Sequence, residues 1–139
     1  MKHRILKYPL LISVFVITLL ISSLCAFAFP ATPYWSHFSG ITADMEVNDY
    51  NWATIDVMCD SDAATVDSLT VTLELQQLDG DWETIETWVE SENDSTISFV
   101  EEAVIPKNYS YRLKVTAEAY SGSTLLEEVT EYFRYGYYS

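Results

Sequence analysis

Apolar and polar side chains alternate one by one through most of this chain, and no other feature of the sequence restricts its fold as much. Between Leu69 and Leu75 every odd position is apolar and every even position is Thr or Glu. Because successive side chains of a strand point to opposite faces, this pattern predicts a strand with one buried and one solvated face. The same reasoning predicts six further strands, in the ranges 41–47, 53–59, 82–89, 96–105, 109–119 and 125–135.

Short turn sequences separate the expected strands. Gly80 lies between two aspartates and Gly122 between two serines, and glycine readily adopts the positive φ of tight turns. Half-buried antiparallel strands must cover their apolar faces with a second sheet, so we expect an all-β, immunoglobulin-like antiparallel β-sandwich of about seven strands. One alternative stays open, because the apolar residues of 125–135 also fit a helical stripe. The β-branched and aromatic residues there favour a strand.

The first 28 residues have the three-part pattern of a secretory signal peptide. Three basic residues precede an uncharged, almost wholly apolar run from Leu10 to Ile21, which is followed by the small-x-small site Ala26-Phe27-Ala28. A bilayer-spanning helix needs about 20 apolar residues, more than this run provides. We therefore expect 1–28 to be a signal-peptide helix, 29–139 to be a single domain, and the protein to be secreted. Retention of the signal peptide as an anchor is the alternative.

Charge restricts the partners of the expected domain. Removal of the signal peptide leaves four basic residues against all 21 carboxylates, a formal net charge of −17 (4 − 21). Such a chain repels phosphate backbones and anionic lipid headgroups, so we expect it to bind neither nucleic acid nor a membrane after cleavage. High net charge also keeps a small domain soluble, and we expect a monomer.

Cysteine usage excludes an internal disulfide. Cys25 lies in the expected signal peptide, which leaves Cys59 as the only cysteine of the domain. Cys59 shares a predicted strand face with Ile55 and Val57, and free cysteine is among the most buried residue types, so we expect it in the core. An intermolecular disulfide and a reactive thiol are the alternatives.

The segment from Ile105 to Ala117 resembles strand F of fibronectin type III and immunoglobulin-like domains. It has an aliphatic residue, a proline, and then a tyrosine followed by alternating apolar residues. The resemblance implies that Tyr111 is the corner tyrosine, whose hydroxyl bonds back to the preceding loop. Pro106 is displaced by one position from the fibronectin pattern, which leaves the exact topology open.

A second resemblance covers nearly the whole expected domain. The motifs that carry it are, in order, Pro33-Tyr34-Trp35, Leu73-Glu74-Leu75-Gln76, Gly80-Asp81-Trp82, Trp88, Tyr109-Ser110-Tyr111-Arg112 and Leu126-Glu127-Glu128. They resemble a family of small secreted proteins of Gram-positive bacteria with an immunoglobulin- or fibronectin-III-like β-sandwich. The resemblance implies export and a sandwich fold, and it brings no assigned activity and no catalytic residue. The chain departs from the family in its acidic charge and in having Lys107-Asn108 where a glycine precedes Tyr109.

Residues suited to catalysis or metal binding are few. His37 is the only histidine of the expected domain, and one histidine with one cysteine does not supply the three or four ligands of a zinc site. We expect no enzymatic activity, no catalytic residue, no bound metal and no cofactor. Calcium is the metal alternative, because the acidic segments 60–62, 79–81 and 90–94 offer oxygen ligands. They lack EF-hand spacing, and Asp and Asn favour turns for conformational reasons.

Two tryptophans give the best indication of a surface role. Trp82, Glu86 and Trp88 share one face of the expected strand 82–89, while Ile85 and Val89 share the other. If the two aliphatic residues face the core, both tryptophans and Glu86 face solvent, where flat rings stack on sugars and an acid binds hydroxyls. Core or edge packing is the alternative, because Trp is highly buried on average and a β-bulge would turn one of the two inward.

These observations predict a non-catalytic, extracellular interaction module that binds an unknown glycan or protein. Its candidate ligand-binding residues are Trp82, Trp88 and Glu86. The first alternative is a self-associating structural or matrix protein of the cell surface, whose acidic chains could be bridged by Ca²⁺. The second is a small hydrolase, which would have to use His37.

Overall fold

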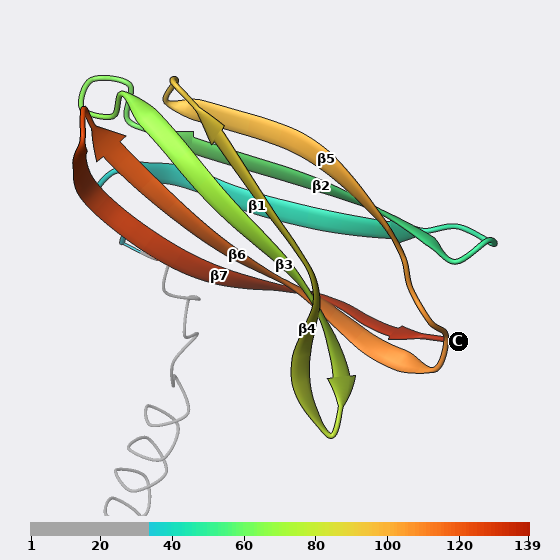
Figure 1. Cartoon of the computed structure of the whole chain (residues 1–139). Helices are drawn as coiled ribbons and strands as arrows, with labels where there is room; N and C mark the ends of the chain where they lie inside the picture. The colour runs from blue at the N-terminus through green and yellow to red at the C-terminus, as the bar shows by residue number, and fades with distance from the viewer. Residues whose placement is uncertain (1–33) are drawn as a thin grey trace, which may run out of the picture. The chain divides into compact units, whose positions relative to one another are not determined.

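The computed structural model describes residues 34–139, which form seven strands (Figure 1). The strands are β1 (Phe38–Val47), β2 (Trp52–Ser61), β3 (Ser68–Asp79), β4 (Asp81–Glu92), β5 (Thr96–Val104), β6 (Tyr109–Ser121) and β7 (Thr124–Tyr138). The signal peptide expected at 1–28 lies outside the described residues. Within 34–139 there is no helix that is long and apolar enough to cross a bilayer.

The strands form two antiparallel sheets, which confirms the predicted immunoglobulin-like sandwich. One sheet has three strands in the order β1-β2-β5, and the other has four in the order β4-β3-β6-β7. A constant-type immunoglobulin domain instead places its fourth strand in the sheet of its first, second and fifth strands. The last segment pairs with β6 along most of its length, so the strand prediction for 125–135 is confirmed and the helical alternative is wrong.

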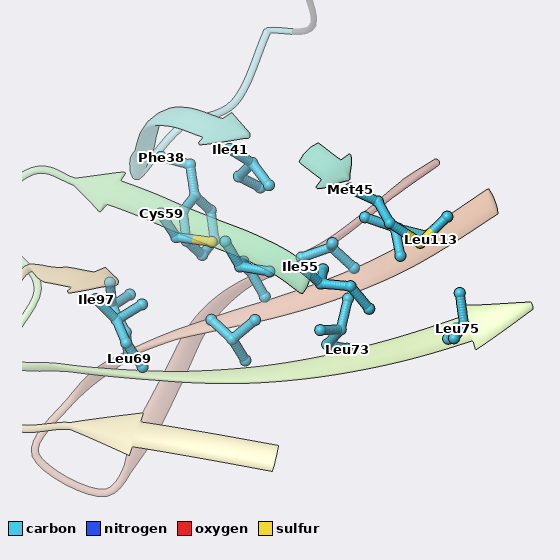
Figure 2. Packing of buried hydrophobic residues seen from close by; sticks show 14 of the residues in the cluster. Phe38, Ile41, Met45, Ile55, Cys59, Leu69, Leu73, Leu75, Ile97 and Leu113 are labelled. Carbon is cyan, nitrogen blue, oxygen red and sulfur yellow. The ribbon is translucent and has the colours of Figure 1, made fainter. Parts of the chain in front are cut away.

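The core lies between the sheets and is built from the apolar side of each predicted alternation. Figure 2 shows side chains of β1, β2 and β5 pointing toward those of β3 and β6. The most completely buried large side chains are Tyr111, Ile55, Leu69, Leu73, Leu75, Ile105 and Leu113. Cys59 lies fully buried among them as a free thiol, as its strand position predicted. The sequence pattern therefore identifies the inner faces of β1, β2, β3 and β6.

Left-handed backbone residues occupy the tight turns. Gly80, between β3 and β4, has a φ of +77°, and Gly122, between β6 and β7, has a φ of +58°. Asn108, directly before Tyr109, has a φ of +71°. Asparagine is one of the few non-glycine residues that adopt this region routinely, so it suits this turn.

One carboxylate fixes the N-terminal segment to β7. Glu127 accepts hydrogen bonds from the backbone N–H groups of Ser36, His37 and Phe38, at 2.9, 2.6 and 3.3 Å. Burial alone would raise the pKa of Glu127, but these three bonds, with a smaller contribution from the His37 charge, lower the pKa below its ordinary value. The entry into β1 is thereby held against the opposite sheet.

Candidate functional site

A β-bulge in β4 decides where the two tryptophans lie. Leu75 of β3 pairs with Glu86, and the next β3 residue, Gln76, pairs with Thr84. Ile85 is therefore an extra residue in β4. An extra residue on one strand interrupts the ladder, and the alternation on either side of it is out of phase by one position.

The tryptophans consequently lie on opposite faces of the sheet, so they do not both face solvent, and the alternative in which a β-bulge turns one of them inward is confirmed. Trp88 pairs with Leu73, whose side chain is fully buried, and packs half-buried against the core. Trp82 pairs with Leu78 on the outer face. Val89, which was expected to face the core, lies on the outer face and is 58% exposed.

Glu86 does not join Trp82 either. It is exposed, and it lies on the same face of β4 as Trp88, because it pairs with the buried Leu75. The three candidate ligand-binding residues therefore do not form one site. Of the three, only Trp82 lies on the outer face of the four-stranded sheet.

Trp82 belongs to a cluster that the sequence analysis missed. The guanidinium carbon of Arg112 lies 4.3 Å from the centre of the Trp82 ring and 4.5 Å from the centre of the Tyr132 ring. Arg112 Nε also donates a 2.7 Å hydrogen bond to Gln76 Oε1. Each cation–π contact at an exposed site contributes about 0.5–1 kcal/mol. We call Trp82, Arg112 and Tyr132 the aromatic–arginine stack.

A chain of polar contacts fixes Gln76 and, through it, the stack. Gln76 Nε2 donates to Thr84 Oγ1 at 3.1 Å, and Thr84 Oγ1 donates to Glu74 Oε1 at 2.8 Å. Glu74 in turn forms a salt bridge with Lys114. The Lys114 hydrogen bond is the main reason why the pKa of Glu74 is lowered, against a smaller opposing effect of burial. Side chains from β3, β4 and β6 thus hold one another on this face.

The same face collects most of the positive charge of residues 34–139. Three of the four Lys and Arg residues in 34–139 lie on this face. Arg112 pairs directly with Arg134 of β7, and Lys114 lies two residues further along β6. Lys114 with Glu74 is the only ion pair in the described part of the chain. Arg112 and Arg134 therefore have no carboxylate partner among residues 34–139.

A shallow hollow adjoins the stack. Its volume is about 200 Å³, and its lining residues are Leu78, Trp82, Ser110, Tyr111, Arg134 and Gly136. The β3–β4 hairpin, which bears Trp82, projects at the bottom of Figure 1 away from the three-stranded sheet. The hollow offers an aromatic ring, a hydroxyl and a guanidinium, which are groups that bind sugars and anions.

The other sequence candidates lie elsewhere. The Nδ1 atom of His37 is 3.2 Å from Thr65 Oγ1, at the β7 edge where Glu127 binds the N-terminal segment. In 34–139 no three His, Cys, Asp or Glu side chains are grouped so that they could hold a metal ion. Asp62 and Asp94 instead accept hydrogen bonds from nearby backbone N–H groups of their own turns. Calcium binding stays a prediction.

The sequence gives a partial indication of the basic residues on this face. The alternation of β6 places Arg112 and Lys114 on a polar face, and basic residues are rare in this domain. Their meeting with Arg134 and Tyr132 depends on the β6–β7 register, which shifts between Tyr111 and Arg112. No local motif encodes that shift.

No family model and no curated protein matches this sequence. Membership of the secreted Gram-positive family therefore stays a prediction. Among solved structures, the chain is similar to a calcium binding mutant of Bacteroides uniformis beta-glucuronidase 2, at 19% sequence identity and a TM-score of 0.40. The match covers 67% of this chain and 13% of that chain. A likeness of this degree does not assign a function.

Proposed function

We propose that this protein is an exported, non-catalytic interaction module that binds a saccharide on the outer face of its four-stranded sheet. The observation that carries the proposal is the position of Trp82, whose ring is stacked on Arg112 and also lines the hollow. Aromatic rings present a large apolar surface with a defined geometry, which suits the C–H faces of sugars. Neighbouring polar groups, such as the Ser110 hydroxyl, would bind sugar hydroxyls.

Rigidity of the site supports this proposal. Arg112 lies between two rings and is bonded to Gln76, whose amide is in turn bonded to Thr84. A site that is ordered before binding loses less conformational entropy when the ligand arrives. The position on sheet strands, rather than on a long loop, has the same effect.

A glycan array probed with the purified protein tests the proposal. We expect binding to at least one saccharide, and loss of that binding in Trp82→Ala. Tyr50→Ala is the matched control, since Tyr50 is an 81% exposed aromatic residue in the β1–β2 turn. Failure to bind any saccharide, or equal loss of binding in both variants, would contradict the proposal.

Self-association is the second candidate function, and the charges of the two outer faces support it. The outer face of the β1-β2-β5 sheet is acidic, with Asp44 directly opposite Asp56, and it exposes Trp52, Met58 and Val100. This surface complements the basic patch of Arg112, Lys114 and Arg134 on the outer face of the other sheet, a face that also bears Glu74, Glu118 and Glu128. Contacts between two different faces of identical chains produce closed rings or, where the rotation between copies does not close, open assemblies.

Light scattering distinguishes the two functions. Self-association predicts a mass that increases with protein concentration at low salt, with or without added Ca²⁺, and that returns to the monomer value in Asp56→Lys. If the measured mass stays that of a monomer under all these conditions, self-association is excluded and the saccharide proposal is unaffected.

A further inference from the structure

We propose that the saccharide is acidic, and that its carboxylate binds to Arg134 and Arg112 while its ring occupies the hollow beside Trp82. This inference rests on the proposed saccharide function and narrows its ligand class. The charges, the hydrogen-bond donors and the size of the hollow each support it.

Two like charges lie side by side on this face. Arg112 and Arg134 are directly opposite residues of β6 and β7, on the same face of the sheet. Like charges in this position destabilise a sheet. The chain has 21 carboxylates, and none forms an ion pair with either arginine within 34–139. A bound carboxylate would supply the missing compensation.

Both guanidiniums have hydrogen-bond donors available for a ligand. A guanidinium has five N–H donors in a planar fork that fits a carboxylate with two parallel bonds. Gln76 accepts a hydrogen bond from Arg112 Nε. Within 34–139, no acceptor is bound to the terminal nitrogens of Arg112 or to any guanidinium nitrogen of Arg134. Stacking against Trp82 and Tyr132 fixes the plane of the Arg112 fork. The terminal donors of Arg112 are therefore free and oriented, and those of the exposed Arg134 are free.

The volume of the hollow fits a single sugar ring. Pockets that enclose drug-sized ligands have volumes of about 300–1,000 Å³. The hollow, at about 200 Å³, is smaller and suits a single ring at the end of a saccharide. Trp82 offers a surface for that ring, Ser110 offers a hydroxyl, and Arg134 lies in the same lining.

The net charge of the domain favours an isolated carboxylate over a polyanion. Twenty-one carboxylates surround a patch in which Lys114 is already neutralised by Glu74. A long polyanion would extend beyond the patch into a repulsive field, whereas one acidic sugar would contact the two arginines alone.

Calorimetric titration with matched ligand pairs tests the inference. The probes are methyl galacturonoside against its methyl ester and sialyllactose against the methyl ester of its sialic acid, because the members of each pair differ only in whether the carboxylate is free. We expect the acidic member of at least one pair to bind about tenfold more tightly, as a charge-assisted hydrogen bond implies. Sodium acetate at the same concentration should not compete measurably.

Arg134→Gln is the decisive variant. It keeps amide donors, removes the charge, and changes an exposed residue, so circular dichroism should be unaltered. We expect it to abolish the preference for the acidic ligand. Lys107→Gln is the matched control, because it removes one positive charge near the chain end, where Lys107 contacts Tyr138 and Ser139. This control should retain the preference.

Different results would overturn the inference of an acidic ligand and the proposed saccharide function. If the acidic and neutral members of each pair bind equally, and Trp82→Ala still abolishes binding, the inference of an acidic ligand is wrong and the proposed saccharide function stands. Strong competition by acetate indicates a small-anion site and overturns the inference as well. Binding of no probe here and of no saccharide on the array overturns both.

Discussion

The hydroxyl of Tyr111 donates a 2.6 Å hydrogen bond to the backbone carbonyl of Pro106, five residues earlier in the chain. The same hydroxyl lies 3.1 Å from Gln77 Oε1. The Tyr111 side chain is fully buried, and this burial, with smaller effects of Tyr109 and Tyr138, raises the pKa of Tyr111 to about 12. The bond ties the β5–β6 connection to the core, and it confirms the corner tyrosine implied by the strand-F resemblance.

Tyr111→Phe should therefore destabilise the fold without changing its core packing. The variant leaves the Pro106 carbonyl and Gln77 without this donor, and a buried unsatisfied group costs about 1–3 kcal/mol. Urea denaturation followed by tryptophan fluorescence measures the loss. Tyr109→Phe is the matched control, since its hydroxyl makes no hydrogen bond within 34–139, and its change should stay within about 0.5 kcal/mol. Equal stability of Tyr111→Phe and the parent would contradict the role assigned to the bond.

The fold was predictable from the sequence because most strands have one consistently apolar side. The pattern Leu69, Val71, Leu73, Leu75 is buried as expected, and the turns at Gly80 and Gly122 lie where positive φ was anticipated. Covering these apolar sides requires two facing sheets, whereas the strand order β1-β2-β5 and β4-β3-β6-β7 was left open by the sequence.

The site was not predictable in the same way. Alternation assumes an unbroken ladder, and the bulge at Ile85 breaks it between Trp82 and Trp88. The position of a β-bulge depends on how the strand packs against its partner rather than on a local motif. The alternation on one side of the bulge therefore does not predict which face the residues on the other side occupy. Likewise, Arg112 and Arg134 are distant in sequence and meet only through the β6–β7 register.

Asn108 provides a test of the turn before β6. Its φ of +71° is in the left-handed region, where glycine has no steric cost and most other residues do. We expect Asn108→Gly to be close to neutral and Asn108→Ala to lower the free energy of unfolding by about 1 kcal/mol. Thermal denaturation of both variants measures the difference. A more stable alanine variant would contradict the assigned backbone strain.

Cys59 should be chemically inert in the native protein. Burial, with a smaller contribution from the charge of Asp60, raises the pKa of its thiol to about 12, and the thiolate is the reactive form. We expect no reaction with a disulfide reagent at pH 8 until denaturant unfolds the domain. Ser98→Cys, on the exposed face of β5, is the accessible control and should react at once. Fast modification of Cys59 in the native state would support the reactive-thiol alternative.

Glu127 should make stability depend on pH in the acid range. Its folded-state pKa is lowered by hydrogen bonds from three backbone N–H groups, so its contribution is fully present above the unfolded-state pKa of about 4.3. That contribution is lost as the pH falls through the folded-state value. Glu127→Gln should lower stability at pH 7 and flatten the dependence below pH 5, as chemical denaturation at several pH values would show.

Glu128→Gln separates this effect from the general repulsion of an acidic chain. Glu128 is the exposed neighbour on the opposite face of β7, and its replacement removes the same charge. We expect it to leave the acid dependence unchanged. Identical pH profiles for the two variants would show that net charge, rather than the Glu127 contacts, governs acid stability.

The outer face of the three-stranded sheet contains a repulsive pair that can be removed. Asp44 and Asp56 lie directly opposite each other in the antiparallel ladder of β1 and β2, and both are exposed. Like charges in this position cost a few tenths to about 1 kcal/mol, and salt screens the repulsion. Asp56→Asn should therefore raise the unfolding free energy by that amount at low ionic strength. The advantage should shrink in 0.5 M NaCl, whereas an equal advantage at both salt concentrations would point to a cause other than charge.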